Sequence, residues 1–258
     1  MAKSVSRLVF LIAAVMLLVS GCGRQTARGK LAVGPDPDTL ALAPEFAAMA
    51  IDACGGMKAW IGARQFDLDC VATFYQADGS HYLTEQQYTV YPWSNSIRIA
   101  GTEPDGDFIW EARGREFSAV QGGKEIGRIT ELMPAEAIAE AVLAATVVPA
   151  RLLDGRAELT QMAAPVKLEG RWYSVVTRAV KPELRDTVTI ADVTFYQNRE
   201  TSVVDRVLIA LGEKLFMVNS YGYRELQKGG VRVPSRLEVF EANGRGASVR
   251  RLIKIDVK

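Results

Sequence analysis

Cys22 is the residue whose surroundings predict a definite covalent chemistry. It ends the stretch LVSGC at residues 18–22, which follows two cations, Lys3 and Arg7, and an apolar run over residues 8–19. The run has the length of a signal-peptide core and is too short to span a membrane. The two residues before the cysteine are small, so the backbone can lie extended in a peptidase that cuts before a lipid-modified cysteine. We therefore predict that Cys22 carries a diacylglycerol and begins the mature chain.

This stretch resembles the lipobox of bacterial lipoproteins. The alternatives are a plain secretory signal or an uncleaved anchor, in which Cys22 would be incidental. The resemblance implies attachment to a membrane through lipid, because acyl chains contribute about 0.8 kcal/mol per buried methylene and a diacylglycerol suffices for stable anchoring. The residue after the cysteine is Gly23, not the Asp that favours retention at the inner membrane. The expected location is thus the outer membrane, facing the periplasm.

Other reactive residue types give no catalytic signature. The sequence has no Gly-x-Ser-x-Gly, no glycine-rich phosphate loop, no His-Glu-x-x-His and no Cys-x-x-Cys. The single histidine, His81, follows a predicted turn without a cluster of metal ligands, which favours an exposed edge over a metal site. Asp67 and Asp69 alternate along a predicted strand, which favours a solvated edge over a pair of glycosidase carboxylates. We expect no enzyme activity, no metal and no cofactor.

The charge balance gives no reason to expect nucleic acid as a partner. The chain has 31 basic and 30 acidic residues, and loss of Lys3 and Arg7 with the signal would leave 29 basic residues. Binding to polyanions depends on clustered Lys and Arg, which this balance does not favour. The predicted partners are the membrane, through lipidated Cys22, and a lipid or acylated ligand.

Two cysteines, Cys54 and Cys70, remain in a compartment where disulfides persist. One interpretation is a disulfide that joins the first helix to the first strand. The other is a pair of separate buried thiols that behave as small apolar residues. Both stay open, because a bridge needs Cα atoms within about 7 Å of each other.

The chain divides into a signal peptide (1–21), the lipidated cysteine with a flexible Gly- and Pro-containing tether (22–43) and a single domain (44–258). In the domain, residues such as Phe66 and Leu68 alternate with polar ones, as in a strand with one buried face. Turn residues then separate strands that have no helix between them, which favours antiparallel pairing. The strands are expected at 66–75, 81–91, 95–101, 107–113, 115–121, 157–168, 171–180, 187–197, 203–211, 214–226, 232–242 and 246–257.

A helical segment interrupts these strands at about residues 134–154. Its first part has an apolar stripe, which includes Ile138 and Val142, opposite Glu136 and Glu140. It is interpreted as a helix that covers one face or end of the sheet, or as a mobile lid over an apolar cavity. Trp60, in a short helix near the N-terminus of the domain, is likewise interpreted as a core aromatic or as a lid residue.

The closing hairpins resemble those of the LolA/LolB-like superfamily of bacterial envelope proteins. The resemblance rests on residues 195–201, Tyr221-Gly222-Tyr223 and residues 229–237, and on Cys54-Gly55-Gly56 followed by Trp60. It implies an α+β fold in which a large curved antiparallel sheet of about eleven strands forms an incomplete β-barrel, with a few helices over its concave side. It also implies that this side receives acyl chains.

The expected function is that of a lipid-anchored envelope protein that binds a lipid or acylated ligand in the half-barrel, as a carrier or acceptor without catalysis. The alternative is a sensor or scaffold module of the same fold that binds a protein partner and no lipid. Strand parity selects the candidate residues that face the groove. They are Phe66, Leu68, Phe74, Phe108, Trp110, Trp172, Val176, Phe195, Ile209, Met217, Leu237 and Val239.

Overall fold

The structure is a computed structural model that describes residues 45–103, 106–126, 133–187, 192–226, 230–244 and 246–258. Its contacts divide the chain into residues 1–31 and residues 32–258, and every described helix and strand lies in the second unit. The predicted signal peptide, Cys22 and the tether fall outside the described residues.

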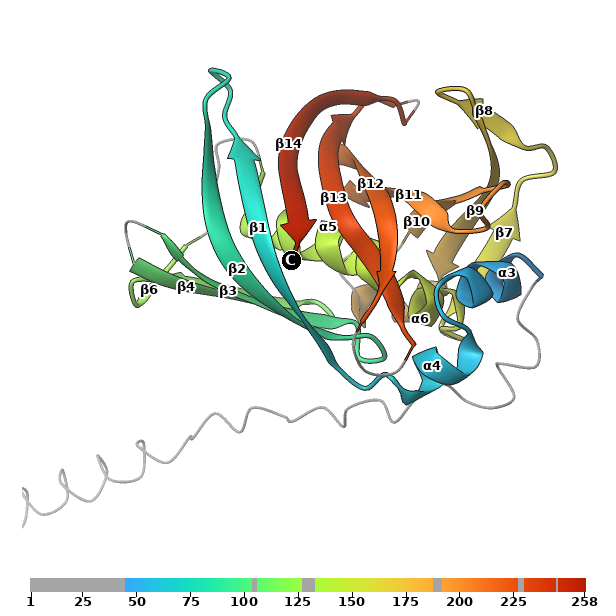
Figure 1. Cartoon of the computed structure of the whole chain (residues 1–258), viewed down its shortest axis with the longest axis horizontal. Coiled ribbons are helices and arrows are strands. Elements are labelled where there is room, and N and C mark those ends of the chain that lie inside the picture. The colour runs from blue at the N-terminus through green and yellow to red at the C-terminus, as the bar shows by residue number, and fades with distance from the viewer. Residues whose placement is uncertain (1–44, 104–105, 127–132, 188–191, 227–229, 245) are drawn as a thin grey trace, which may run out of the picture. The chain divides into compact units, whose positions relative to one another are not determined.

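The described part of the domain forms one antiparallel sheet of 14 strands (Figure 1). Its order is β6-β5-β4-β3-β2-β1-β14-β13-β12-β11-β10-β9-β7, with β8 paired to β9, so β6 and β7 are edges and the described sheet is open. The strands are β1 (Phe66–Tyr75), β2 (His81–Tyr91), β3 (Ser96–Glu103), β4 (Gly106–Arg113), β5 (Glu116–Gln121), β6 (Lys124–Glu125), β7 (Ala157–Gln161), β8 (Val166–Leu168), β9 (Arg171–Val180), β10 (Asp192–Asn198), β11 (Val204–Leu211), β12 (Lys214–Glu225), β13 (Arg232–Ala242) and β14 (Ser248–Val257).

The predicted meander is confirmed, and the pairing of the first strand with the last joins its two halves. β1 pairs with β14 in a register that places Ala72 opposite Ile255. The described sheet has two strands more than the twelve ranges given above, and exceeds the expected number of about eleven, because short segments also pair. The predicted strand at 157–168 divides into β7 and β8, because Pro165 between them cannot donate to a ladder. The short strand β6 extends the meander beyond β5, and a 3₁₀ helix, Pro182–Thr187, was not predicted.

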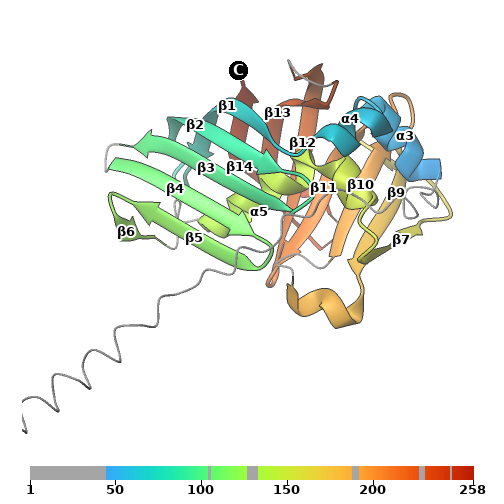
Figure 2. The same ribbon diagram turned by 90° about the horizontal axis from the view of Figure 1, so that it is seen from below.

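The described residues form four α-helices beside this sheet: α3 (Glu45–Ala53), α4 (Met57–Gly62), α5 (Ala135–Thr146) and α6 (Val148–Leu152). Helix α5 contacts β3, β4 and β5 on one side and β11, β12 and β13 on the other. Figure 2 shows it on the inner side of the curved sheet. Every residue of α5 except Glu136 is buried. This helix therefore fills the space between the two halves of the open barrel.

The junction between α3 and α4 depends on Gly55. Its φ is +109°, and a Cβ there would lie 1.9 Å from the carbonyl oxygen of Gly230. Close by, the buried Trp60 donates from its indole Nε1 to the carbonyl oxygen of Cys54 at 2.9 Å. The structure thus places Trp60 in the core, in agreement with its interpretation as a core aromatic.

We expect Gly55→Ala to lower the free energy of unfolding by about 2 to 4 kcal/mol, because it adds backbone strain to a collision with rigid backbone. Gly79→Ala is the matched control, since Gly79 also has a positive φ, of +86°, but no atom within 4 Å of the place that an added methyl group would take. Its expected loss is about 1 to 2 kcal/mol. Denaturant titration of both variants measures the difference, and equal losses would contradict the proposed collision.

Candidate functional site

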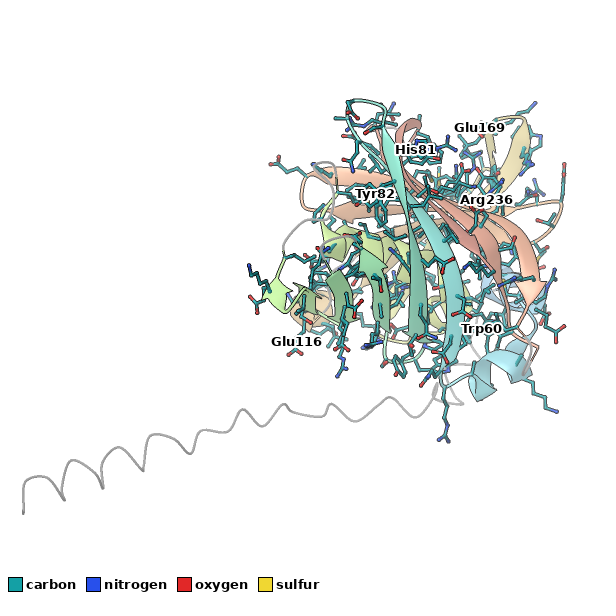
Figure 3. The ribbon with its side chains drawn as sticks, turned by 60° about the vertical axis from the view of Figure 1, so that its left-hand side comes forward. Trp60, His81, Tyr82, Glu116, Glu169 and Arg236 are labelled. Atoms are coloured by element: carbon teal, nitrogen blue, oxygen red, sulfur yellow. The ribbon has the colours of Figure 1, made fainter. Side chains whose placement is uncertain are left out.

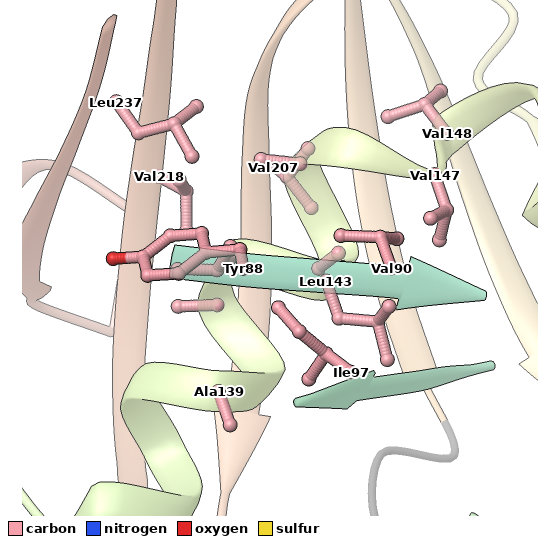
Figure 4. Close-up of a cluster of buried hydrophobic side chains, with 14 of the residues drawn as sticks. Tyr88, Val90, Ile97, Ala139, Leu143, Val147, Val148, Val207, Val218 and Leu237 are labelled. Carbon is pink, nitrogen blue, oxygen red and sulfur yellow. The ribbon is translucent and has the colours of Figure 1, made fainter. Parts of the chain in front are cut away.

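The concave face of the sheet is the candidate site, and it is apolar. Ten of the twelve predicted groove residues belong to one buried core cluster on this face. In Figure 4, side chains of one half of the sheet, such as Tyr88, approach Ala139 and Leu143 of α5, while Val218 and Leu237 approach from the other half. The ten residues are Phe66, Leu68, Phe74, Phe108, Trp110, Val176, Phe195, Ile209, Leu237 and Val239.

Met217 and Trp172 lie outside the core cluster, and for Met217 the placement in the groove was wrong. Met217 lies between Phe216 and Val218, which both belong to the core cluster, so its side chain leaves the opposite face of β12. It is buried there, close to the loop at Gly246. Trp172 is 48 % exposed at the start of β9, with the Lys167 ammonium 5.7 Å from its ring centroid.

The two described cysteines are free and buried, so of the two interpretations left open for Cys54 and Cys70 the structure has the separate thiols. Burial is the main cause that raises the pKa of each thiol to about 12. A thiol with such a pKa is almost entirely protonated at neutral pH and is a poor nucleophile. Neither cysteine is therefore suited to covalent chemistry in the folded state.

Helix α5 carries a buried ion pair that the sequence did not reveal. Glu140 and Arg151 meet at 3.3 Å, with side chains only 2 % and 6 % exposed. The Arg151 Nε also donates to Asn95 Oδ1 at 3.0 Å, in the turn between β2 and β3. Burial raises the pKa of the Glu140 carboxyl, an effect that the Arg151 guanidinium opposes. The pair thus ties α5 to α6 and to the first half of the sheet.

A second arginine extends this network to the other half of the sheet. Arg178 of β9 donates from Nε to the carbonyl oxygen of Arg151 at 3.1 Å and pairs with Asp154 at 2.5 Å. Asp154 also forms an ion pair with Arg156, with 2.8 Å between Oδ1 of Asp154 and Nε of Arg156. We call Asn95, Glu140, Arg151, Asp154 and Arg178 the ion network. Through Glu140, the sixth of the twelve residues of α5, it ties the middle of this helix to both halves.

The outer face has a depression of about 850 Å³ over β1 to β4. Its apolar members include Leu83 and Ile109, which are 61 % and 40 % exposed. Charged groups of both signs border it, among them Glu85 and Lys258, which pair at 2.6 Å. The depression lies on the opposite face from the predicted groove and was not anticipated.

The polar residues singled out from the sequence do not gather into a metal site in the described part of the chain. No group of three His, Cys, Asp or Glu residues able to hold a metal occurs there. His81 and Asp67 are exposed, and Asp67 accepts a hydrogen bond from Thr89 at 2.8 Å. Among the described helices, none has the length and apolar character needed to cross a membrane.

Known structures share this architecture. A LolA superfamily protein from Nitrosomonas europaea matches with a TM-score of 0.54 and 13 % identity, over 82 % of this chain and 91 % of its own. A domain titled for outer membrane lipoprotein sorting, from Vibrio parahaemolyticus, matches with a TM-score of 0.51 and 6 % identity, over the same shares. No protein-family model and no curated protein sequence matches the chain. The chain has a LolA-like fold, as its closing hairpins predicted.

Proposed function

We propose that this protein binds an acyl chain of a lipid or acylated molecule on the concave face, as a carrier or acceptor in the cell envelope. The observation that carries the proposal is the way in which this face is covered. An apolar sheet surface from both halves of the barrel is covered mainly by α5, in which six of twelve residues are alanine, with α3 and α6 beside it. The likeness to LolA-like structures supports the same function, although it demonstrates only the fold.

An acyl chain can replace α5 on this surface at modest cost. Burial stabilises in proportion to apolar area, about 25 cal/mol per Å², and alanine side chains cover less area than the methylenes of a long chain. A sixteen-carbon chain gains about 0.8 kcal/mol per buried methylene. The ion network holds α5 at Glu140, so the segment before this residue, Ala135–Ala139, is the part that can leave. Transfer to a second groove or bilayer of similar affinity would then need no covalent step.

Hydrogen exchange with and without an acyl probe tests this mechanism. The protein is a chain of residues 32–258, the compact unit that holds all described elements, and the probe is 1-palmitoylglycerol. We expect the probe to bind and to speed amide exchange in residues 135–139, while strands β10 to β13 stay protected. Binding with unchanged or slower exchange there would contradict displacement of α5, and a failure to bind would contradict the proposed function.

Anchoring through Cys22 is part of the proposal, and so is a location at the outer membrane facing the periplasm. We expect Cys22→Ser in the full chain to abolish labelling with a radioactive fatty acid and to block cleavage before residue 22. Ser20→Ala is the matched control, because alanine is also small and should preserve both. Metabolic labelling and the electrophoretic mass report the outcome. A processed Cys22→Ser protein that stays in the membrane fraction would show that the anchor is not this lipid.

The outer depression favours a second candidate function, that of an envelope module that binds a protein partner and no lipid. Interfaces place apolar side chains at their centre and polar ones at the rim, as Leu83 and its charged neighbours do. In this case the groove stays filled by α5. A stoichiometric partner whose binding is lost in Leu83→Asp but kept in Val249→Asp, at a position 64 % exposed elsewhere, would favour this candidate.

A further inference from the structure

The outer face of the second half of the sheet carries a nearly buried arginine, Arg206 of β11. The next residue, Val207, belongs to the core cluster, so the side chain of Arg206 leaves the opposite face of the strand. This side chain is 11 % exposed. Its guanidinium lies over the ring of Tyr173 of β9, with 5.5 Å between Cζ and the ring centroid. A stacked guanidinium is held in one orientation and keeps its planar fork for a carboxylate.

The group that occupies this fork is Glu169, in the turn between β8 and β9. Both terminal nitrogens of Arg206 donate to the two carboxylate oxygens of Glu169. The Glu169 side chain is 67 % exposed, so this partner of a nearly buried cation is open to solvent. Ion pairs with an exposed member add little to stability, because water screens them. A second carboxylate can therefore take the place of Glu169 at low cost.

The turn that holds Glu169 does not favour a glutamate. Leu168 pairs with Arg171, which leaves Glu169 and Gly170 as a two-residue loop with φ of +48° and +85°. Positive φ at both positions is typical of a type I′ hairpin turn, which prefers Asn, Asp or Gly at its first position. Glutamate adopts a positive φ less readily than these residues. The turn alone therefore does not account for Glu169, whereas its contact with Arg206 does.

A buried acceptor without a donor lies beside this fork. Asn219 of β12 is the direct cross-strand partner of Arg206, so the two side chains are neighbours on the outer face. Asn219 is 5 % exposed, and none of the described residues forms a hydrogen bond with its Oδ1. Buried polar atoms normally have a partner. The missing partner of Asn219 Oδ1 must be a donor, because a carbonyl oxygen only accepts.

A second guanidinium on the same face has a donor to spare. Arg236 of β13 lies over the ring of Tyr221, its cross-strand partner on β12, with 4.5 Å between Cζ and the ring centroid. Tyr221 follows Asn219 by two residues and so shares its face. The Arg236 Nε lies 3.8 Å from a carboxylate oxygen of Glu238 and has no hydrogen-bond partner within the described part of the chain. The face therefore offers two guanidinium groups and one free acceptor.

We propose that Arg206, Asn219 and Arg236, which we call the outer arginine site, bind the C-terminal residue of a peptide, whose carboxylate displaces Glu169. The carboxylate takes the fork of Arg206, and the N–H of the same residue donates to Asn219 Oδ1. One Cα separates these two groups of the ligand, which suits a direct cross-strand pair of protein side chains. In Figure 3, Glu169 and Arg236 lie towards the end of the domain opposite Trp60. The site is independent of acyl binding, which concerns the other face of the sheet.

Two probes that differ only at the C-terminus test this site: N-acetyl-alanyl-alanine and its C-terminal amide. Their dissociation constants for residues 32–258 are measured by nuclear magnetic resonance titration. In Glu169→Asn, which removes the carboxylate and suits the turn, we expect the acid to bind at least about fivefold more tightly than in the wild type. In this variant the acid should bind at least about tenfold more tightly than the amide, because bonds to charged groups are strong.

Glu158→Asn is the matched control. It removes the same charge from an exposed position of β7, the strand that pairs with β9, and leaves the Arg206–Glu169 pair in place. Its affinity for the acid should equal that of the wild type. Two further changes, each added to Glu169→Asn, locate the contacts. Arg206→Lys keeps the charge but loses the fork and should reduce the ratio of acid to amide, whereas Asn219→Leu should weaken both probes and keep the ratio.

Each contrary result overturns a stated part of the inference. Equal affinities of acid and amide in Glu169→Asn would overturn carboxylate recognition. An equal gain in Glu158→Asn and Glu169→Asn would show an effect of net charge and not of a freed fork. Unchanged affinities in both the Arg206→Lys and the Asn219→Leu variants would place the peptide elsewhere. If neither probe binds to any variant, the site fails as a whole, and the proposed acyl binding on the concave face is unaffected.

Discussion

Arg151→Met is expected to lower the free energy of unfolding by about 3 to 5 kcal/mol, because it leaves the Glu140 carboxylate buried without its cation. The pair spans 3.3 Å with almost no solvent access. Replacement of both residues, in Glu140→Leu with Arg151→Met, removes the buried charge and should recover most of the loss. Denaturant unfolding of the two single variants and the double variant measures this coupling.

The matched control is Arg113→Met. Arg113 pairs with Glu111 at 3.2 Å, nearly the same distance, but its side chain is 68 % exposed. The expected loss there is at most about 1 kcal/mol, because water screens exposed pairs. If Arg113→Met and Arg151→Met cost the same, burial of the Glu140 pair contributes nothing, and the ion network does not hold α5.

The Arg151→Met variant should also become more stable as the pH falls from 7 towards 5. Burial raises the pKa of Glu140 above its usual value of 4.5 in the folded protein, and loss of the cation raises it further. The folded state therefore binds a proton that the unfolded state releases, and stability declines as the pH rises through the folded-state pKa. The measurement is the free energy of unfolding of the variant relative to the wild type between pH 7 and pH 5. If this difference shows the variant losing stability as the pH is lowered, the assignment to Glu140 is contradicted.

Trp60→Ala is expected to lower the free energy of unfolding by about 3 to 5 kcal/mol, as large-to-small substitutions of buried aromatic residues do. The Trp60 side chain is fully buried, its ring lies edge-on to Phe66 at 6.3 Å between centroids, and its indole donates to the Cys54 carbonyl. The loss therefore combines a cavity with the loss of one of the two hydrogen bonds of the Cys54 carbonyl, which keeps the bond from the Arg232 N–H. Thermal and denaturant unfolding both report it.

Trp172→Ala provides the comparison, because Trp172 is half exposed at the rim of the sheet. Its expected loss is within about 1 kcal/mol. If Trp60→Ala were as mild as Trp172→Ala, and acyl binding changed instead, Trp60 would be a lid residue and not part of the core.

Most of the sheet could be predicted from the sequence because one face of each strand is buried. Phe66, Leu68 and Cys70 alternate with Asp67 and Asp69, and this period fixes both the strand and its inward face. In β12 the same argument fails, because Phe216, Met217 and Val218 are all buried. A strand that is covered on both faces shows no alternation, so sequence parity could not place Met217.

The role of α5 could be predicted only in part. Its helical period and its position over the sheet follow from the apolar stripe, which includes Ile138 and Val142. The stripe also placed Glu140 on a solvated side, whereas the structure buries it against Arg151. A residue eleven positions away in another helix supplied the charge that made this burial tolerable. Helical periodicity contains no information on such a partner.

Native mass spectrometry with lipid extraction tests the central claim most directly. The sample is the chain of residues 32–258, exported to the periplasm with a cleavable signal and purified without detergent. We predict about one co-purified acyl species per chain, which is released when the protein unfolds. A mass equal to that of the polypeptide alone, unchanged after incubation with membrane lipids, would contradict acyl binding and favour the module that binds a protein partner.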